Sequence, residues 1–363
     1  MADWTLPFNA SYRWMRVSRS TGEEVERLYG IQEGGRIERN QDTECKESGS
    51  VDAVAWQGIG ADLVRAWLDA TFEDGAVESV ALGTFLPTVS DRSVGGAATT
   101  STVNLTGRLK ELSDDMFGQA FSLPAGTNAV NYAAQICKAA GFEVIQDDSD
   151  YTLQERVYYG ISASSDAGDD RAETKLAVVN DLLDRAGFSS ASTDSMGRIV
   201  LRKYVEPSER TPSGSFVEGA NARFLREITE TRDSSNVANR VYAVFAAPST
   251  DEGASGVIGV AEDDSGGEWS IQAMGRVIAR KESYSEEATQ AEADAKAAEL
   301  LRTSQAVATT LDIDHVYAPV TVGDSVDVDY PSQGIKGRYG IRRQTIDLGA
   351  GCLTESEVRA YGR

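Results

Sequence analysis

The sequence is poor in residues that carry acid–base and metal chemistry. Among 363 residues there are one histidine, three cysteines and five methionines. The cysteines, Cys45, Cys137 and Cys352, lie far apart in the chain, so their spacing gives neither a zinc-binding pattern nor a disulfide framework. We therefore expect free thiols, as in a protein that folds and assembles in a reducing cytosol.

Long hydrophobic runs are also missing. No apolar stretch approaches the roughly 18 residues that a membrane-spanning helix needs. The first residues, from Met1 to Phe8, contain neither a basic nor a hydrophobic segment, so we expect no secretory signal there. A length of 363 residues, of which 41% are hydrophobic, predicts two or three folded domains and no membrane insertion by this chain.

Positive charge is scarce relative to negative charge. The chain has 35 Lys and Arg against 57 Asp and Glu, and its formal net charge is −22. Such a chain repels phosphate backbones, which argues against specific nucleic-acid binding. The acidic excess has two interpretations that the sequence leaves open. It is either a solvated surface that keeps the protein soluble, or the wall of a passage through which DNA moves without adhering.

Residues 1–107 have the pattern of a β domain. Polar and apolar residues alternate over short segments separated by turn signals, with strands expected near 12–18, 26–31, 36–39, 49–56, 64–72 and 77–86. Asp74-Gly75 predicts a tight hairpin turn. The polar, glycine-rich stretch from Ser90 to Thr100 is expected to be a loop. Short strands spaced by turns are typical of a β-barrel or a β-sandwich.

Residues 108–205 change to a mixed pattern. The segments 127–140 and 174–186 repeat apolar residues with the i, i+3, i+4, i+7 spacing of an amphipathic helix. Each begins with a threonine that can cap the helix, and each is followed by Gly-Phe, at Gly141-Phe142 and Gly187-Phe188. This region therefore predicts a small α/β module with two similar helices.

Residues 206–363 return to a β pattern. The Pro- and Ser-rich stretch 206–215 is a linker candidate, with a second β domain expected beyond it. An acidic, Gly- and Ser-rich stretch from Ala246 to Gly267 is expected to be a loop, and an alanine-rich helix is expected at about 285–302. The sequence thus predicts an α+β, mainly β fold, in which two barrel-like β domains flank a small α/β module.

Candidate catalytic residues are few. His315 would have to serve any Ser-His-Asp triad, but it lies in a strand pattern and the chain has no nucleophile elbow. Two carboxylate pairs, Asp312 with Asp314 and Asp327 with Asp329, each alternate onto one strand face and could bind a cation or serve a glycosidase. Acids of this kind on exposed strands are more often solvated. We expect no catalytic, metal-binding or cofactor-binding residue in this chain.

Two further patterns have ordinary explanations. The segment from Asp166 to Asp170 superficially resembles a calcium loop, but it lacks the alternating ligands and the closing Glu, which favours a surface loop. Five tryptophans could stack on sugars, although packing in a core or a subunit interface is the stronger expectation. They are Trp4, Trp14, Trp56, Trp67 and Trp269.

Several segments spread along nearly the whole chain carry a resemblance to one known family. They are Leu82-Gly-Thr-Phe-Leu-Pro-Thr-Val-Ser-Asp-Arg92, Arg108-Leu-Lys-Glu-Leu-Ser-Asp-Asp115, residues 181–188 with 194–199, residues 233–241, residues 292–301 and Val322-Gly-Asp-Ser-Val326. Their order resembles that of the phage tail hub family, the baseplate hub or tail-tip proteins of long-tailed phages.

The resemblance implies a structural, non-enzymatic protein of the virion, placed at the tail tip after assembly in the host cytoplasm. Hubs of this family are homotrimers, and each chain supplies two β-barrel domains to a ring of six. Such a ring joins the sixfold tail tube and the distal tail protein ring to a threefold central fibre or spike. The tape measure protein and DNA pass through its lumen during DNA ejection. Three copies would carry 3 × −22 = −66, consistent with an acidic passage.

Two other functions stay open on the sequence alone. One is the hub of a phage-related injection machine. The other is a β-rich carbohydrate-binding protein or glycan-active enzyme, for which the Asp312/Asp314 or Asp327/Asp329 pair would be required.

Overall fold

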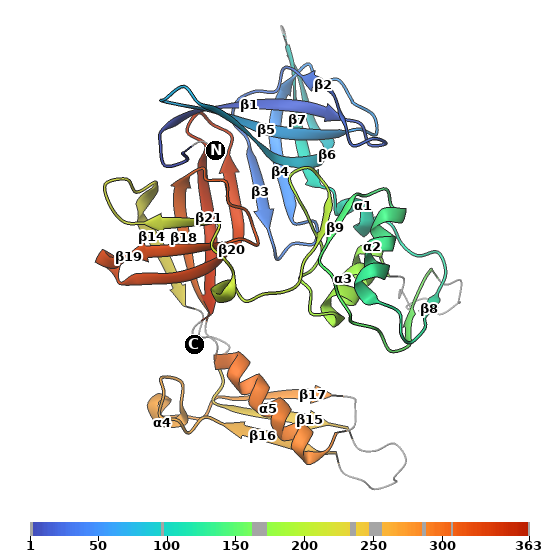
Figure 1. Ribbon diagram of the computed structural model, residues 1–363, viewed down its shortest axis with the longest axis vertical. Coiled ribbons are helices and arrows are strands. Elements are labelled where there is room, and N and C mark those ends of the chain that lie inside the picture. The colour runs from blue at the N-terminus through green and yellow to red at the C-terminus, as the bar shows by residue number, and fades with distance from the viewer. Residues whose placement is uncertain are drawn as a thin grey trace. The chain divides into compact units, whose positions relative to one another are not determined.

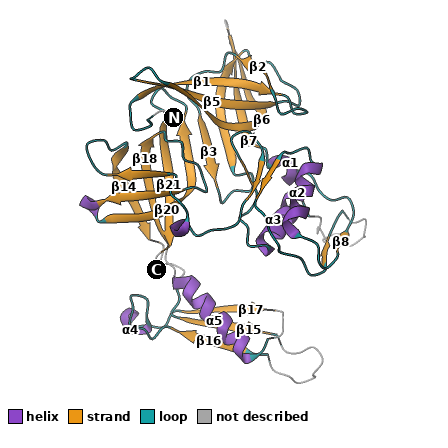
Figure 2. Ribbon diagram, viewed as in Figure 1, coloured by secondary structure: helices purple, strands orange, loops and turns teal. Residues whose placement is uncertain are grey.

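The computed structural model describes residues 3–95, 98–161, 173–232, 237–246, 256–284, 288–305 and 308–361. The chain forms two compact units, of which unit 1 is Met1–Ile228 with Asp312–Val358 and unit 2 is Thr229–Leu311 with Arg359–Arg363 (Figure 1). Strands predominate over helices, and the predicted α+β, mainly β class is confirmed (Figure 2). None of the helices in these ranges has the length and apolar character needed to cross a membrane. The predicted domain boundaries stay a prediction.

The first β lobe of unit 1 consists of β1 (Phe8–Val17), β2 (Glu24–Leu28), β3 (Arg36–Asn40), β4 (Glu47–Val54), β5 (Leu63–Phe72), β6 (Val77–Gly95) and β7 (Ala98–Gly107). They follow the order β2-β1-β5-β6-β7-β4-β3, and each neighbouring pair is antiparallel. The hairpin predicted at Asp74-Gly75 is confirmed, because Gly75 turns the chain between β5 and β6 with a left-handed φ of 85°.

The stretch from Ser90 to Thr100 was expected to be a loop. That prediction is wrong for residues 90–95 and 98–100, and residues 96–97 lie outside the described residues. β6 continues to Gly95 and pairs with β7 from Ala98 onwards. The side chains from Ser90 to Gly95 are all exposed, so this ribbon has no apolar face that the sequence could reveal. Cross-strand hydrogen bonds between backbones form without a buried face, and the threonines of β7 favour extended structure.

The second β lobe consists of β13 (Gly214–Val217), β14 (Phe224–Arg232), β18 (Ala308–Val316), β19 (Ser325–Tyr330), β20 (Ile335–Asp347) and β21 (Leu353–Tyr361). The order is β14-β18-β21-β20, while β19 pairs with the first half of β20 and β13 runs parallel to β19. The candidate linker at 206–215 is partly regular, since it contains the 3₁₀ turn Pro207–Glu209 and the start of β13.

The two β lobes are hydrogen-bonded to each other. The second half of β20 pairs antiparallel with β3, from Arg343 opposite Asn40 to Asp347 opposite Arg36. Over the described residues, both lobes therefore belong to one thirteen-stranded sheet. They also share a core, because C-terminal side chains pack among the buried residues of the first lobe, namely Tyr317, Ile346, Leu348 and Cys352.

The α/β module, residues 108–205, contains α1 (Lys110–Ser113), β8 (Phe121–Leu123), α2 (Ala129–Ala139), β9 (Val144–Gln146), β10 (Arg156–Tyr158), α3 (Lys175–Arg185), β11 (Ser192–Thr193) and β12 (Ile199–Leu201). It has a hydrophobic core of its own, built around the apolar faces of α2 and α3. Both helices end as predicted. Gly141 and Gly187 have left-handed φ values of 87° and 71°, and the amide of the following Phe donates to the carbonyl five residues back.

The N-terminal caps of these helices follow the sequence only in part. Thr174 caps α3, as predicted, by accepting a hydrogen bond from the amide of Ala177. Thr127 does not cap α2. Its hydroxyl donates instead to the carbonyl of Pro124, and the neighbouring Asn128 accepts the capping bond from the helix. Both residue types are good caps, so local preference alone could not choose between them.

Unit 2 is a small sheet covered by one helix. It contains β15 (Arg240–Phe245), β16 (Ile258–Glu262), α4 (Ile271–Met274), β17 (Ala279–Tyr284) and α5 (Gln290–Gln305). β15 is central, antiparallel to β16 and parallel to β17, and α5 lies across β15 and β16 (Figure 2). The alanine-rich helix is thus present, although residues 285–287 of its predicted range lie outside the described residues.

Of the loop expected from Ala246 to Gly267, residues 247–255 lie outside the described residues, and the part that covers β16 is wrong. β16 has only five residues and is followed by acidic residues, so the sequence shows no clear alternation of polar and apolar residues there. At its centre, Gly259 allows the backbone of α5 to approach closely. A Cβ atom on Gly259 would lie 1.9 Å from the carbonyl oxygen of Ala293. Ala293 and Ala297 are themselves fully buried, so small residues on both elements allow this contact.

Candidate functional site: the junction of the α/β module with the β lobes

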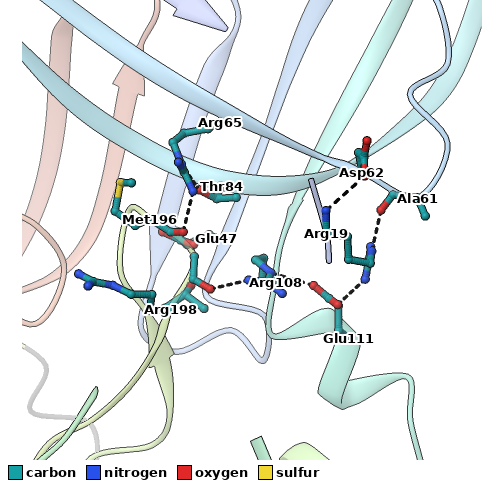
Figure 3. A network of polar contacts seen from close by, with 12 residues as sticks. Arg19, Glu47, Ala61, Asp62, Arg65, Thr84, Arg108, Glu111, Met196 and Arg198 are labelled. Carbon is teal, nitrogen blue, oxygen red and sulfur yellow. Dashed lines mark hydrogen bonds and ion pairs between the residues drawn. The ribbon is translucent and has the colours of Figure 1, made fainter. Parts of the chain in front are cut away.

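The turn between β11 and β12, residues 194–197, lies against the first β lobe (Figure 3). Three successive carbonyls of this turn accept hydrogen bonds from side chains, at distances of 2.8–3.0 Å. The acceptors are Ser195, Met196 and Gly197, and the donors are, in that order, Thr84, Arg65 and Arg108. The module is therefore held to the lobe by specific polar contacts.

The sequence builds this turn from Asp194 and Gly197. The Asp194 carboxylate accepts hydrogen bonds from the amides of Met196 and Arg198, at 3.0 and 2.9 Å, and so closes the turn. Gly197 has a left-handed φ of 81°, and a Cβ atom there would lie 2.8 Å from the Arg108 side chain. Glycine is thus required at this position both for the backbone conformation and for the space.

Arg65 is the central cation of the junction and is only 3% exposed. Besides its bond to Met196, it donates from Nε to Thr84 Oγ1 at 2.9 Å and from Nη1 to Glu24 at 3.1 Å. Glu24 also accepts from the indole of Trp67 at 2.8 Å. These hydrogen bonds offset the cost of burying the guanidinium. They also connect β5 to β6, to β2 and to the 194–197 turn.

Ion pairs extend the junction to the β1–β2 hairpin (Figure 3). Arg108 donates from Nε to Glu111 at 2.9 Å, and Arg19 pairs with the other oxygen of the same carboxylate. Arg19 also donates from Nε to the carbonyl of Ala61 at 2.6 Å. One carboxylate of α1 therefore links an arginine of the module to an arginine of the lobe.

A second set of contacts starts at the β3–β4 turn. Lys46 has a left-handed φ of 58°, and its Nζ donates to the hydroxyl and the carbonyl of Ser190, at 2.6 and 3.1 Å. Glu47, the next residue, accepts a hydrogen bond from Thr193 at 2.8 Å. Both side chains are at least nine-tenths buried. Two adjacent residues, Lys46 in the turn and Glu47 at the start of β4, thus form a second set of contacts with the module.

A buried polar chain runs from this turn into the second β lobe. It consists of Arg39, Gln344, Ser356 and His315, all at most 4% exposed. Arg39 donates to the Gln344 side-chain oxygen at 2.8 Å and to the carbonyl of Leu82. Gln344 and Ser356 are 3.4 Å apart, and Ser356 lies 2.8 Å from Nε2 of His315. Hydrogen-bonded polar groups therefore connect the two lobes.

Burial raises the pKa of Glu47 to about 7, although Arg39 and Thr193 both favour the carboxylate. The Arg39–Glu47 separation of 4.0 Å is too long to offset the burial. Because the folded pKa exceeds the unfolded one, this group's contribution to stability is complete below pH 4.5 and is lost as pH rises through 7. The loss amounts to at most about 3 kcal/mol.

We expect Glu47→Gln to remove this loss while keeping an acceptor for Thr193. Urea unfolding at pH 5 and pH 8 should show a smaller decrease in stability for the variant than for the wild type, by up to about 3 kcal/mol. Glu38→Gln, on the exposed side of β3, is the control and should follow the wild type. Equal pH dependence of Glu47→Gln and wild type would refute the assignment.

His315 lies on β18 and is 1% exposed. Its Nδ1 donates to the carbonyl of Val316 at 2.8 Å, so Nε2 accepts from Ser356. Burial lowers the pKa of His315 to about 4, and the ring is neutral. This pair resembles part of a hydrolytic triad in geometry, but a backbone carbonyl occupies the place of the acid, and a substrate has no access to either side chain.

The carboxylate pairs are not brought together as an acid–base site. Asp327 forms a two-bond ion pair with Arg338, at 2.8 and 3.2 Å, and Asp329 pairs with Lys336 at 3.0 Å. Asp312 and Asp314 lie half-buried on β18. No group of three or more potential metal ligands occurs in the described part of the chain. The calcium-like segment from Asp166 to Asp170 lies outside the described residues.

Three of the five tryptophans, Trp4, Trp14 and Trp67, pack against other side chains of the first β lobe and its core. Trp14 is 5% exposed, and Trp4 makes edge-on ring contacts with Phe8, Phe72 and Tyr317. Trp67 donates to Glu24 and lies under Arg13.

Sequence reasoning missed the residues that build the junction, above all Arg39, Glu47, Arg65 and Thr84. A signal was present for Arg39 and Glu47, because each shares a strand face with a core residue, Ile37 and Val51 respectively. An inward charge on a strand identifies a buried polar contact but not its partner, which for Arg39 lies 305 residues away.

Sequence comparisons give no match, either to a protein-family model or to a curated protein. Solved structures do match, over nearly the full length. A tail protein from Neisseria meningitidis MC58 is 13% identical with a TM-score of 0.65, and the match covers 96% of each chain. The 43 kDa tail protein of prophage MuSo2 from Shewanella oneidensis is 13% identical with a TM-score of 0.63, covering 96% of this chain and 98% of that one. A Francisella PdpA–VgrG complex chain is 8% identical with a TM-score of 0.57, covering 99% of this chain and 54% of that one. The chain has the fold of phage tail proteins.

Proposed function

We propose that the chain is a structural hub of a phage tail tip. The observation that carries this proposal is the match to two tail proteins over 96% of the chain, which includes both β lobes, the α/β module and the helix-covered sheet. A partial match would be explained by a common β module. Agreement in the order of all parts is better explained by a shared architectural role.

In this role, three copies form a ring to which each chain contributes two β lobes. The continuous sheet through β3 and β20 supports this arrangement, because it fixes the two lobes of one chain to each other. Two fixed lobes in each of three copies give six positions around an axis, which matches a sixfold tube on one side and a threefold fibre or spike on the other. The distal tail protein ring and the central fibre or spike are the expected partners.

The acidic charge fits a passage for DNA and the tape measure protein. A ring of three copies would carry 3 × −22 = −66, which disfavours adhesion of a phosphate backbone. A structural, non-enzymatic role is supported by the sealed environment of His315 and Ser356 and by the ion pairs that occupy Asp327 and Asp329.

The hub of a related injection machine is the second candidate, and the similarity to the PdpA–VgrG complex chain favours it. Both candidates require a ring, so electron microscopy of the purified full-length chain tests their common claim. We expect class averages with threefold symmetry and a central opening. Particles of a single copy, or closed twofold pairs, would contradict both candidates.

A further inference from the structure

A cavity of about 610 Å³ lies in unit 1 where the α/β module meets both β lobes. Most of its lining comes from four places: the end of β3 with the β3–β4 turn, the segment around β11 and β12, the stretch that contains Arg210 and Thr211, and the turn before β19. This volume is within the range of small-molecule binding sites. Neither the tail role nor the junction contacts described above account for an open space of this size.

The lining is positive although the chain is strongly negative. Five Lys and Arg side chains line it against four Asp and Glu, so the difference is 5 − 4 = +1, compared with −22 for the whole chain. Burial raises the pKa of Glu47 to about 7, so this carboxyl is partly protonated near neutral pH, and lowers the pKa of Lys46 to about 8, so this ammonium stays mostly protonated there. The cavity is therefore a local site of cationic excess.

Three of these cations have no carboxylate partner within 4.0 Å in the described ranges: Lys46, Lys203 and Arg210. Lys46 is held by Ser190, and the Arg210 guanidinium donates to the carbonyls of Val205 and Gly323. Lys46 is nine-tenths buried and sits in a left-handed backbone conformation, so its position is tightly determined.

The remaining polar lining consists largely of hydroxyl groups, among them Ser192, Ser195, Thr211 and Thr321. Cationic side chains combined with hydroxyl donors are the usual means of binding phosphate oxygens. Among the described residues that line the cavity none is aromatic, so they offer no ring on which a nucleobase could stack.

We propose that this cavity binds a small oxyanion, either free phosphate or a phosphate-bearing small molecule, through Lys46, Lys203 and Arg210. A bound anion would bridge the β3–β4 turn, the module and the second lobe, and would thereby stabilise the junction. The proposal goes beyond the tail role and does not depend on it.

Calorimetric titration of the full-length chain with inorganic phosphate at pH 7 tests the proposal, with sodium chloride of equal ionic strength as the reference. We expect saturable binding of phosphate at millimolar concentration or below. Lys203→Gln should weaken binding about fivefold. Its side chain makes no hydrogen bond within the described ranges, so the variant should fold normally. Adding Arg210→Gln should weaken binding further, to below detection.

The matched control is the pair Lys281→Gln and Arg226→Gln, which makes the same change in net charge at exposed positions outside the cavity. This control should bind phosphate like the wild type. If phosphate and chloride give the same heats, or if the control loses as much affinity as the cavity variants, the proposal is wrong. Glucose 6-phosphate as a second titrant separates the two ligand sources. Tighter binding than phosphate assigns the site to a phosphate-bearing molecule, and weaker binding assigns it to the free ion.

Discussion

Replacing Gly259 by alanine is expected to unfold unit 2 and leave unit 1 folded. The added Cβ would lie 1.9 Å from the carbonyl oxygen of Ala293 and 2.6 Å from the amide of Asp294, both in the backbone of α5. No side-chain rotation relieves a clash with a helix backbone, so α5 must move off the sheet. Overpacking of a core costs about 1–3 kcal/mol when side chains can adjust, and we expect a loss above this range.

Hydrogen exchange followed by mass spectrometry measures this effect for each unit separately. In Gly259→Ala, amides of α5 and β15 should lose their protection, while those of β5 and β6 keep theirs. Gly267→Ala is the control in the same unit, because its nearest neighbour is the movable Ser265 hydroxyl, at 3.2 Å. Retained protection of α5 in Gly259→Ala would show that the helix does not pack on β16 as described.

Replacing Arg65 by methionine is expected to loosen the α/β module from the first β lobe. Methionine retains much of the buried volume but supplies no donor to Thr84, Glu24 or the carbonyl of Met196. Removing one partner of a buried ion pair leaves the other charge uncompensated, at a cost of about 3–5 kcal/mol. Glu24 is partly exposed and keeps its bond from Trp67, which places the expected loss near the lower end of that range.

Urea unfolding followed by hydrogen exchange at the 194–197 turn tests this prediction. Arg65→Met should shift the unfolding midpoint downward and expose the turn. Arg36→Met removes an arginine from β3 of the same lobe, where the ion pair with Glu38 is largely exposed, and should change stability by less than about 1 kcal/mol. If both variants unfold alike, the buried network contributes little to holding the module in place.

The sequence predicted local structure best where the apolar spacing of a helix or strand is bounded by a residue with a specific backbone or capping role. Gly141 and Gly187 were identified as helix ends because a left-handed residue must follow each amphipathic segment, and both have that conformation. Apolar alternation likewise located β5 and the first part of β6. Thr174 was recognised as a cap by the same kind of argument.

The failures share a physical cause. The β6–β7 ribbon is paired through its backbone and exposes its side chains from Ser90 to Gly95, so no hydrophobic period exists there. β16 depends on Gly259, because the absence of a side chain there allows α5 to pack closely on the strand. In the first case the two strands of a hairpin pair through their backbones, and in the second the strand contacts the backbone of a later helix, so neither interaction requires an apolar pattern in the sequence.

The candidate site could not be predicted from the sequence for a related reason. Arg39 and Glu47 are inward charges, and the sequence does show that strands carry them, whereas Arg65 lies on the face of β5 opposite the core. Their partners come from other parts of the chain, as with Arg39 and Gln344, which are 305 residues apart. Local patterns identify which residues need a partner, whereas only the three-dimensional arrangement identifies the partner.

The mass of the full-length chain in solution tests the proposed ring most directly. Native mass spectrometry and sedimentation equilibrium, carried out over increasing protein concentration, measure it without reference to any partner. The account predicts a species of 3 × 39.0 = 117 kDa that becomes dominant as concentration rises. A single species of 39.0 kDa at every concentration, or a pair of copies, would contradict it.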